Sequence, residues 1–294
     1  MDHPSRRTFV KTMGAAGILA AMPVLGDNKM DNTPTIQNVI DKVIMECTGS
    51  PLKETVDVVK AGDPDMPVKG IAITFLATCD IIEQAAAKGC NFIITHEPTF
   101  YNHLDQTDWL ANDPVYQHKR DLINKHNMVV WRCHDYIHSH KPDGIMEGMK
   151  KQLGWESYQS SDKPYLYELP SMTLQELADQ LKTKFNIPKL LAVGDPDLPC
   201  KTVAFSMGAP GGQSQMRMAA ASRPDVLICG EINEWETNIY FKDANHAGIK
   251  SAMVLLGHRF SEEAGMHTVE GWVNDWYPQV ETHFISCKEP FQYL

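Results

Sequence analysis

Three apolar runs of the chain each end in a short cluster of histidine and carboxylate side chains. The runs are 91–95, 128–133 and 252–257. Imidazole nitrogens and carboxylate oxygens together bind divalent first-row metals. The clusters therefore predict a site for one or two ions of Zn, Fe, Mn, Co or Ni, assembled from distant segments. The expected metal ligands are His96, Glu97, His138, His258 and Glu262.

Two of the clusters contain side chains spaced four residues apart. His134 and His138 form one pair, and His258 and Glu262 form the other. Four residues make about one helical turn, so both members of a pair share a face if the segment enters a helix. Twelve histidines make one such pair weak evidence, but two pairs after matching apolar runs favour a metal site. The alternative for Glu262 is that it only compensates the dipole at a helix start.

The cluster His96-Glu97 lies at the end of a predicted strand. Successive strand residues point to opposite faces, so both side chains reach one metal only if the chain turns there. Pro98 favours such a turn because it disfavours helical backbone at the residue before it. The alternative is one inward ligand and one solvent-exposed carboxylate.

Further polar groups are candidates for roles around the metal. Glu231 and His134 are candidate proton carriers in catalysis. Asp135 is either another ligand or a group that orients the ring of His134. The glycine-rich segment 208–212 could offer backbone N–H groups to an anion, or form a plain turn. A Gly-x-Ser-x-Gly nucleophile motif and a Gly-x-Gly-x-x-Gly dinucleotide motif are absent from the sequence.

The elements that must position these residues alternate between strands and helices. The order strand, helix, strand followed by an acid, helix, strand followed by histidine occurs twice, which suggests a duplication. This pattern predicts an α/β fold of two related lobes, with mixed, largely parallel sheets that share the metal site. In such sheets, sites form at the carboxyl ends of strands. We expect the lobes to span 35–157 and 158–294, with 158–170 connecting or bordering them and an amphipathic helix at 173–185.

Composition limits the classes of partner. The chain has 294 residues, is 43% hydrophobic and carries a formal charge of −10, and its pI is near 5.6. This acidity argues against nucleic acid as a partner and against adhesion to anionic lipid. The seven cysteines show no Cys-x-x-Cys spacing, so most are expected to be reduced core residues.

The first residues resemble an export signal. Arg6-Arg7 precedes the modestly apolar run 13–25, as in a twin-arginine signal. We therefore expect a signal at 1–26, a linker at 27–34 and a periplasmic or otherwise exported protein without stable membrane insertion. The alternative is a disordered basic tail. Twin-arginine export carries folded proteins, which suits a metal site that forms only on folding.

The ordered set of motifs resembles the Nif-three-like family, also called GTP cyclohydrolase I type 2-like or dinuclear metal centre hexameric proteins. The resemblance runs from about residue 35 to the C-terminus. It rests on the segments 79–85 and 89–98, the His134-x3-His138 pair, Gly230-Glu231 and Gly257-His258-x2-Ser261-Glu262. It implies two related α/β lobes and a homohexamer with metal pairs facing an inner cavity.

The residues match the family pattern in part. His258 and Glu262 match it intact, and Glu231 matches an acid near the site. Glu97 stands where the family has a second histidine, and His138 stands where it has an aspartate. The exchange keeps the number of ligands and moves the negative charge, as expected of a retained but altered site.

The expected function is that of a metal-dependent hydrolase acting on an unknown small molecule through a metal-bound hydroxide. The alternative is a non-catalytic, metal-carrying or ligand-binding oligomeric module. The family's cyclohydrolase label fits poorly, because an exported protein would not meet GTP.

Overall fold

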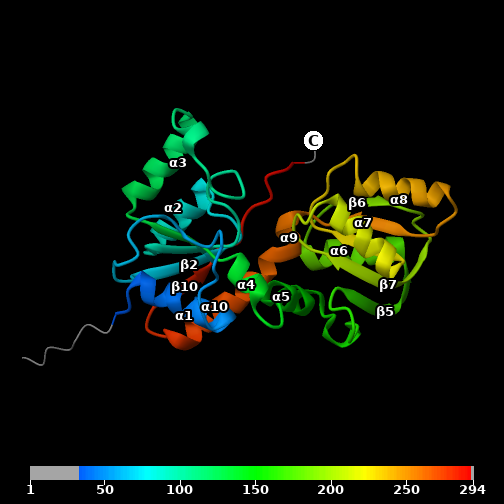
Figure 1. The fold of residues 1–294 in the computed structure, drawn as a ribbon, viewed down its shortest axis with the longest axis horizontal. Coiled ribbons are helices and arrows are strands. Elements are labelled where there is room, and N and C mark those ends of the chain that lie inside the picture. The colour runs from blue at the N-terminus through cyan, green and yellow to red at the C-terminus, as the bar shows by residue number, and fades with distance from the viewer. Residues whose placement is uncertain (1–32, 293–294) are drawn as a thin grey trace, which may run out of the picture. The chain divides into compact units, whose positions relative to one another are not determined.

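The computed structural model describes residues 33–292. The predicted export signal, 1–26, and most of the predicted linker, 27–34, lie outside the described residues. Within 33–292 the chain forms two five-stranded sheets whose strands alternate with helices (Figure 1). The central strands of both sheets are parallel. The predicted α/β class, with two mixed and largely parallel sheets, is confirmed.

The first sheet has the strand order β1-β4-β3-β2-β10. Its strands are β1 (Val59–Ala61), β2 (Gly70–Thr74), β3 (Phe92–Thr95), β4 (Val129–Arg132) and β10 (Glu281–Phe284). Only β1 is antiparallel to its neighbour. The strands β2, β3 and β4 are buried at every position, as expected for apolar runs in a parallel sheet covered on both faces.

The second sheet has the strand order β5-β7-β8-β9-β6. Its strands are β5 (Leu166–Thr173), β6 (Leu191–Val193), β7 (Pro199–Ser206), β8 (Val226–Cys229) and β9 (Ala252–Leu255). The parallel strands β7, β8 and β9 form its centre, and both edges, β5 and β6, are antiparallel. The two sheets therefore share a parallel three-stranded centre and differ at their edges.

Helices connect and cover the strands. They are α1 (Ile36–Thr48), α2 (Cys79–Ala87), α3 (Pro114–Lys125), α4 (Asp135–Ser139), α5 (Gly144–Leu153), α6 (Leu174–Phe185), α7 (Gly212–Ser222), α8 (Thr237–His246), α9 (His258–Glu262) and α10 (Met266–Trp276). The predicted amphipathic helix at 173–185 is confirmed as α6. Thr173 and Glu176 form a capping box at its start, which satisfies backbone N–H groups that have no partner within the helix. None of the helices in residues 33–292 has the length and apolarity needed to cross a bilayer.

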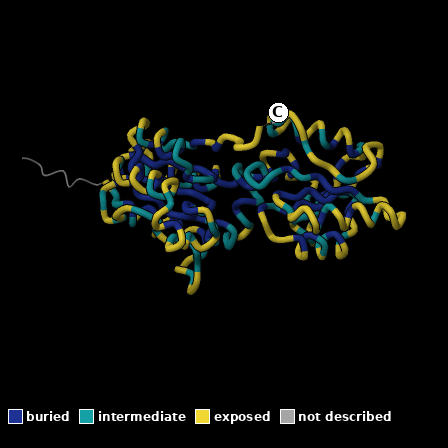
Figure 2. The backbone as a smooth tube through the Cα atoms, turned by 90° about the horizontal axis from the view of Figure 1, so that it is seen from above, coloured by how far each residue is buried: buried dark blue, intermediate teal, exposed yellow. Residues whose placement is uncertain are grey.

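Each sheet has an apolar core on both faces. In the first lobe, α1 and α10 pack on one face, and α2 and α3 pack on the other. In the second lobe, α5 and α6 cover one face, and α7 and α8 cover the other. Helix α5 contributes Ile145 to the first core and Met149 to the second. Figure 2 shows these buried segments running through the inside of both lobes.

The cysteines belong mainly to these cores. All seven carry free thiols, and six of them are buried. The exception is Cys79, the first residue of α2, which is half-buried. The prediction of mostly reduced core cysteines is therefore confirmed.

The expected lobes divide the chain into two consecutive segments, whereas the first sheet also takes a strand from the C-terminal segment. The last strand, β10, pairs with β2 of the first sheet, and α10 packs on the first core through Val269 and Val273. The first lobe is therefore built from both ends of the described chain. The segment 158–170, expected to connect or border the lobes, contributes its last residues to edge strand β5. An edge position accommodates Pro170, which has no N–H group to donate to a neighbouring strand.

Candidate metal centre

The first lobe places its polar clusters at the ends of adjacent parallel strands. His96 and Glu97 follow β3 directly, and His134 comes two residues after β4. The two strands are in register, with Thr95 opposite Arg132. The short helix α4 then brings His138 back over His134, with a hydrogen bond from the His138 N–H group to the His134 carbonyl (3.1 Å).

The second lobe places its cluster at the equivalent edge of its own sheet. Strands β8 and β9 are in register, with Cys229 opposite Leu255. Glu231 follows β8, and helix α9 begins at His258 and ends at Glu262. The Nε2 atom of His258 lies 3.0 Å from Glu262 Oε2, so the spacing of four residues does bring this pair together.

Four imidazole rings converge on the carboxylates of Glu97 and Glu262. The Nε2 atom of His258 lies 3.3 Å from Glu97 Oε1, and that of His96 lies 3.3 Å from Glu262 Oε2. The Nε2 atom of His134 is 3.8 Å from Glu97 Oε1, and that of His138 is 3.9 Å from Glu262 Oε1. The donor atoms of His96, Glu97 and Glu262 all lie within 4.8 Å of one another, as do those of His96, His134 and His138.

The opposite nitrogen of every ring, Nδ1, has an oxygen partner. These partners are a backbone carbonyl or carboxylates, which can only accept a hydrogen bond when ionised, so Nδ1 carries the proton. In the neutral ring Nε2 then presents its lone pair, which is the usual arrangement of metal-binding histidines. The four pairs are His96 with the Cys133 carbonyl (3.1 Å), His134 with Asp135 (2.9 Å), His138 with Asp143 (3.0 Å) and His258 with Glu231 (3.0 Å).

One orphaned atom indicates that a cation fits this cluster. The Nε2 atom of His96 is buried and makes no hydrogen bond, because Glu262 Oε2, 3.3 Å away, can only accept one. Buried polar atoms are nearly always satisfied, so this nitrogen lacks the group that it is positioned to bind. The same donors, imidazole nitrogen and carboxylate oxygen, are those that divalent first-row metals take. The residues present therefore fit a metal ion.

The carboxylates at the centre are held in their charged form. Burial alone would raise the pKa of Glu97, but its hydrogen bond to His258 and the nearby imidazoles lower it to about 2. Burial opposes ionisation of Glu262 as well, yet His258 and His96 hold its pKa well below the usual range. Both groups therefore stay negatively charged at neutral pH, as metal binding requires.

The imidazoles are shifted in opposite directions. Burial and the neighbouring His96 lower the pKa of His134 to about 4. Burial would also lower the pKa of His258, but its contacts with Glu262 and Glu97 raise it to about 10. For His138 burial also acts to lower the pKa, but the hydrogen bond with Asp143 and the charges of Asp143, Glu262 and Glu97 together raise it. The proton on His258 thus lies between the carboxylates of Glu97 and Glu262.

The structure places the predicted residues as follows. All five expected metal ligands lie in the cluster, and Glu97 is 9% exposed, so it is not the solvent-exposed carboxylate of the alternative interpretation. His134, predicted as a proton carrier, lies among the candidate ligands. Glu231, the other predicted proton carrier, lies behind His258, with its side chain 59% exposed. Asp135 faces the Nδ1 atom of His134, which is the orienting role of the two considered.

Sequence reasoning missed two residues of the site, Arg132 and Asp143, and considered Gly208 only as part of a possible anion-binding segment. Arg132 is wholly buried beside Glu97. Asp143 caps helix α5 and also contacts His138. Gly208 has a φ of 59°, and a Cβ atom there would lie 2.3 Å from Glu262 Oε1. The sequence did contain a signal for each residue. Arg132 is a charge inside an apolar run, Asp143 is an acid before a helix, and Gly208 is a glycine after a strand.

In the glycine-rich segment 208–212, two backbone N–H groups are bonded to side chains of the protein. The N–H group of Gly208 donates to Ser261 Oγ (3.0 Å), and that of Gly212 donates to Glu236 Oε2 (3.1 Å). Two of the groups that could have bound an external anion are therefore already occupied by side chains of the protein.

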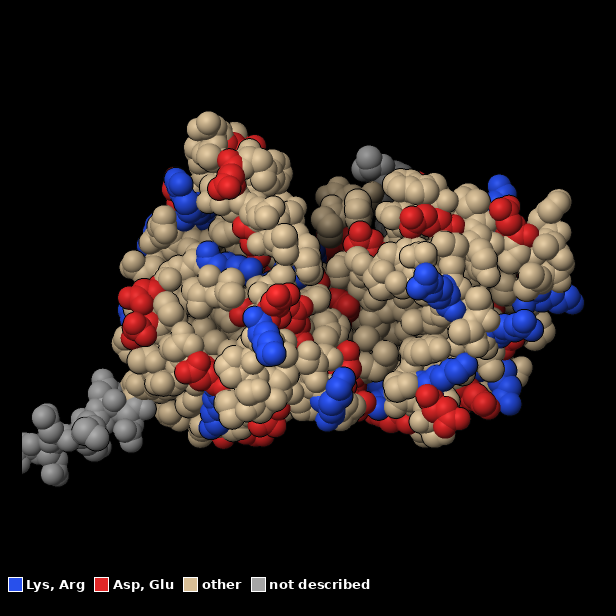
Figure 3. Space-filling view, viewed as in Figure 1, with Lys and Arg blue, Asp and Glu red and all other residues tan. Residues whose placement is uncertain are grey.

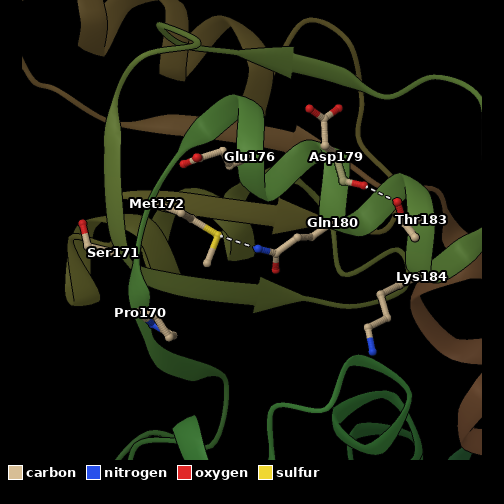
Figure 4. Close-up of a pocket in the computed structure, with 8 residues that line it drawn as sticks. All are labelled: Pro170, Ser171, Met172, Glu176, Asp179, Gln180, Thr183 and Lys184. Atoms are coloured by element: carbon tan, nitrogen blue, oxygen red, sulfur yellow. Dashed lines mark hydrogen bonds between the residues drawn. The ribbon is translucent and has the colours of Figure 1, made fainter.

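A separate surface groove lies in the second lobe between β5 and α6 (Figure 4). Its lining residues are Pro170, Ser171, Met172, Glu176, Asp179, Gln180, Thr183 and Lys184. None of the candidate metal ligands belongs to this lining.

On the face drawn in Figure 3, acidic and basic side chains are interspersed. Among the described residues, the cluster of histidine and glutamate side chains at the strand ends is therefore the candidate functional site.

Comparison with known proteins agrees with this geometry. Residues 52–290 match the family model described as Duf34/NIF3 (NGG1p interacting factor 3), and the chain belongs to this family. It is 29% identical over 224 residues to a "GTP cyclohydrolase 1 type 2 homolog" of Clostridium acetobutylicum, covering 70% of this chain and 81% of that relative. A Chlamydia pneumoniae protein of the same description is 27% identical over 247 residues, covering 79% of this chain and 89% of the relative.

Solved structures share the fold. A Bacillus cereus protein related to NIF3 superposes with a TM-score of 0.70 at 14% identity, covering 89% of this chain and 99% of its own. Staphylococcus aureus protein SA1388 superposes with a TM-score of 0.67 at 17% identity, covering 90% of this chain and 100% of its own. These similarities establish a fold common to the three proteins.

Proposed function

We propose that this protein binds one or two divalent first-row metal ions and hydrolyses a small molecule. The observation that carries the proposal is the common orientation of four histidines. Each has its Nδ1 atom held by an oxygen and its Nε2 atom turned toward Glu97 or Glu262. Catalytic sites commonly use three protein ligands for each ion and leave the fourth position to water or substrate, so six converging residues are enough for two ions.

Exposure favours catalysis over permanent storage of the metal. His96 and the two carboxylates are buried, whereas the side chains of His134, His138 and His258 are 23%, 26% and 24% exposed. The cluster therefore has a closed side and a side that solvent reaches. Catalytic metal sites keep a position open to water or substrate, whereas structural sites are closed.

The residues have separable tasks in this proposal. Bound divalent metal would supply Lewis acidity and lower the pKa of a coordinated water molecule. Glu97 and Glu262 provide the negative charge that holds the cation. Glu231 fixes the proton of His258 at Nδ1, and Asp135 does the same for His134, so that both Nε2 atoms stay directed inward.

The decisive experiment combines metal analysis with a substrate screen. We expect purified protein to contain one or two first-row metals per chain and to hydrolyse at least one small ester, phosphoester or cyclic amide. The Glu262→Gln variant should lose both properties, while Glu270→Gln, which alters a carboxylate paired with His267 instead, should keep them. Fully metal-loaded protein without turnover on a broad panel would favour the alternative, a non-catalytic metal-carrying or ligand-binding module.

Two further proposals concern the setting of the site. We propose export through the twin-arginine route, because Arg6-Arg7 precedes a modestly apolar run. Replacing both arginines by lysine should leave the protein unprocessed in the cytoplasm, and normal export of that variant would contradict the proposal. We also propose a homohexamer on the basis of the family resemblance, to be tested by sedimentation of the purified protein.

A further inference from the structure

Arg132 brings a buried positive charge next to the candidate metal site. Its side chain is fully buried, and its Nε and Nη1 atoms donate to the backbone carbonyls of His96 (3.1 Å) and His103 (2.6 Å). Its Nη2 atom lies 3.4 Å from Glu97 Oε2. A guanidinium group stays protonated in proteins, and a buried charge requires a partner of opposite sign. Glu97 is therefore the counter-ion of Arg132.

This pairing makes the two oxygens of Glu97 unequal. Its Oε2 faces Arg132, and its Oε1 faces the Nε2 atoms of His258 (3.3 Å), His134 (3.8 Å) and His96 (3.8 Å). One oxygen is thus directed to the guanidinium and the other to the imidazole cluster.

Glu262 provides the contrast. Its Oε2 lies 3.0 Å from His258 Nε2 and 3.3 Å from His96 Nε2, and its Oε1 lies 3.9 Å from His138 Nε2. Among the described residues no lysine or arginine forms an ion pair with it. Both of its oxygens are consequently directed to the imidazole cluster.

We propose that Arg132 is a positioning residue that restricts Glu97 to a single metal-binding oxygen, Oε1. The inference rests on the proposed metal site and concerns how one ligand is presented to it. Arg132 acts through Glu97 and does not itself face the imidazole nitrogens. Without the guanidinium, Oε2 is free to join Oε1 on the same ion, since carboxylates bind metals through one oxygen or two.

The test uses Co²⁺ as a spectroscopic probe. A rise in coordination number from four or five to six weakens the visible absorption of Co²⁺. Arg132→Met removes the charge and keeps much of the side-chain volume, so we expect the Co²⁺ extinction coefficient to fall several-fold in this variant. Arg132→Lys keeps a charge without the planar fork and should give an intermediate spectrum.

A matched control separates the spectral effect of Arg132 from a general loosening of the loop that follows Glu97. Lys60 is also a buried cation, and its Nζ atom lies 3.0 Å from Asp105 Oδ2, in the loop that follows Glu97. It forms no ion pair with Glu97, so Lys60→Met should leave the Co²⁺ spectrum unchanged. Equal spectral changes in Lys60→Met and Arg132→Met, or no change in a folded, loaded Arg132→Met protein, would overturn the inference.

The unaltered protein gives an independent decision if Arg132→Met does not fold. In a crystal structure of the Co²⁺-loaded chain, Glu97 should bind through Oε1 alone, with Oε2 on Arg132. Coordination through both oxygens would refute the inference and leave the proposed metal function intact. Absence of Co²⁺ binding by the unaltered chain would instead refute the proposed function, and the inference with it.

Discussion

The two lobes share the same arrangement of central strands but place different residues after equivalent strands. Each has three parallel, in-register strands at its centre, and in each the chemistry follows the second and third of these strands. After its second strand the first lobe places His96 and Glu97, which are buried. At the equivalent position the second lobe places Gly230 and Glu231, and Glu231 lies behind the candidate ligand His258 rather than among the candidate ligands.

Close packing explains part of this difference. A Cβ atom at Gly230 would lie 2.5 Å from Ser261 Oγ and 2.6 Å from the backbone of Gly208, so the second lobe has no room for a side chain there. The first lobe has a fully buried histidine at its corresponding strand end. The comparison teaches that a repeated scaffold preserves where a strand ends, while local packing decides whether that end bears a ligand.

The largest effect is expected at the carboxylate that the second lobe contributes to the candidate site. Glu262→Gln should reduce metal affinity by more than about 100-fold, because even a residue that only orients a ligand is commonly worth 10–100-fold. Both oxygens of Glu262 face imidazole nitrogens, and no lysine or arginine among the described residues forms an ion pair with it. Competition with a chromophoric chelator measures the affinity. An effect below tenfold would show that the second lobe does not supply a central ligand.

The corresponding change in the first lobe, Glu97→Gln, should lower the free energy of unfolding as well as the metal affinity. Glu97→Gln leaves Arg132 buried without its counter-ion, and breaking such a pair costs about 3 kcal/mol. We therefore expect a lower free energy of unfolding for metal-free Glu97→Gln than for metal-free Glu262→Gln. Chemical denaturation of both variants without metal tests this difference. Equal stabilities would contradict an essential charge pair between Glu97 and Arg132.

Outer carboxylates should matter less, and similarly in the two lobes. Glu231→Gln and Asp143→Asn each remove the charge that faces the Nδ1 atom of one histidine, His258 or His138. We expect a loss of metal affinity of about 10-fold in each case. Titration of both variants by the same competition assay provides the check. A large loss in one lobe and none in the other would show that the supporting acids are not equivalent.

The smallest effect is a release of about one proton on metal binding at pH 7. His258, with its pKa raised to about 10, is protonated in the metal-free site and must lose the Nε2 proton to become a ligand. Affinity should therefore rise with pH toward 10. Calorimetric titrations in buffers of different ionisation enthalpy measure the protons released, and a value near zero would contradict a protonated His258.

The same shift predicts how metal-free stability varies with pH. A histidine with a raised pKa stabilises the fold fully below its unfolded value of about 6.5, and this contribution is lost as pH rises through about 10. For Glu97, whose pKa is lowered to about 2, the contribution is present above the unfolded value and lost as pH falls toward 2. Metal-free protein should accordingly unfold more easily at both extremes.

Much of the fold could be predicted because its signals are local. Apolar runs marked β3, β4, β8 and β9, and the short segments that follow β3, β4 and β9 contain all five expected ligands. The return of β10 to the first sheet has no local signal, since its pairing partner β2 lies about 200 residues earlier in the chain. The segment 158–170, which the sequence analysis interprets as connecting or bordering the lobes, includes part of β5, where buried Tyr167 and Leu169 alternate with exposed Glu168 and Pro170.

The candidate site was predictable to a similar depth. The spacing of histidine and glutamate residues identified the candidate metal donors, because the ability to bind a metal depends on the type of side chain, which the sequence shows directly. Which nitrogen each ring turns inward depends on partners such as the Cys133 carbonyl and Glu231, which tertiary structure alone brings into contact. Arg132 was hidden in an apolar run. A charge inside a buried strand requires a partner of opposite charge, and Glu97 is that partner.

The return of the C-terminal strand also sets an order of events during synthesis. A ribosome that has released only the segment up to β9 holds a first sheet whose β2 edge is open and a helix α1 whose partner α10 is missing. Domains usually begin to fold from the N-terminus as the chain emerges, yet here the first lobe cannot be completed until α10 and β10 have left the exit tunnel. His258 and Glu262 emerge just before them, so the metal donors become complete at nearly the same moment as the scaffold that holds them.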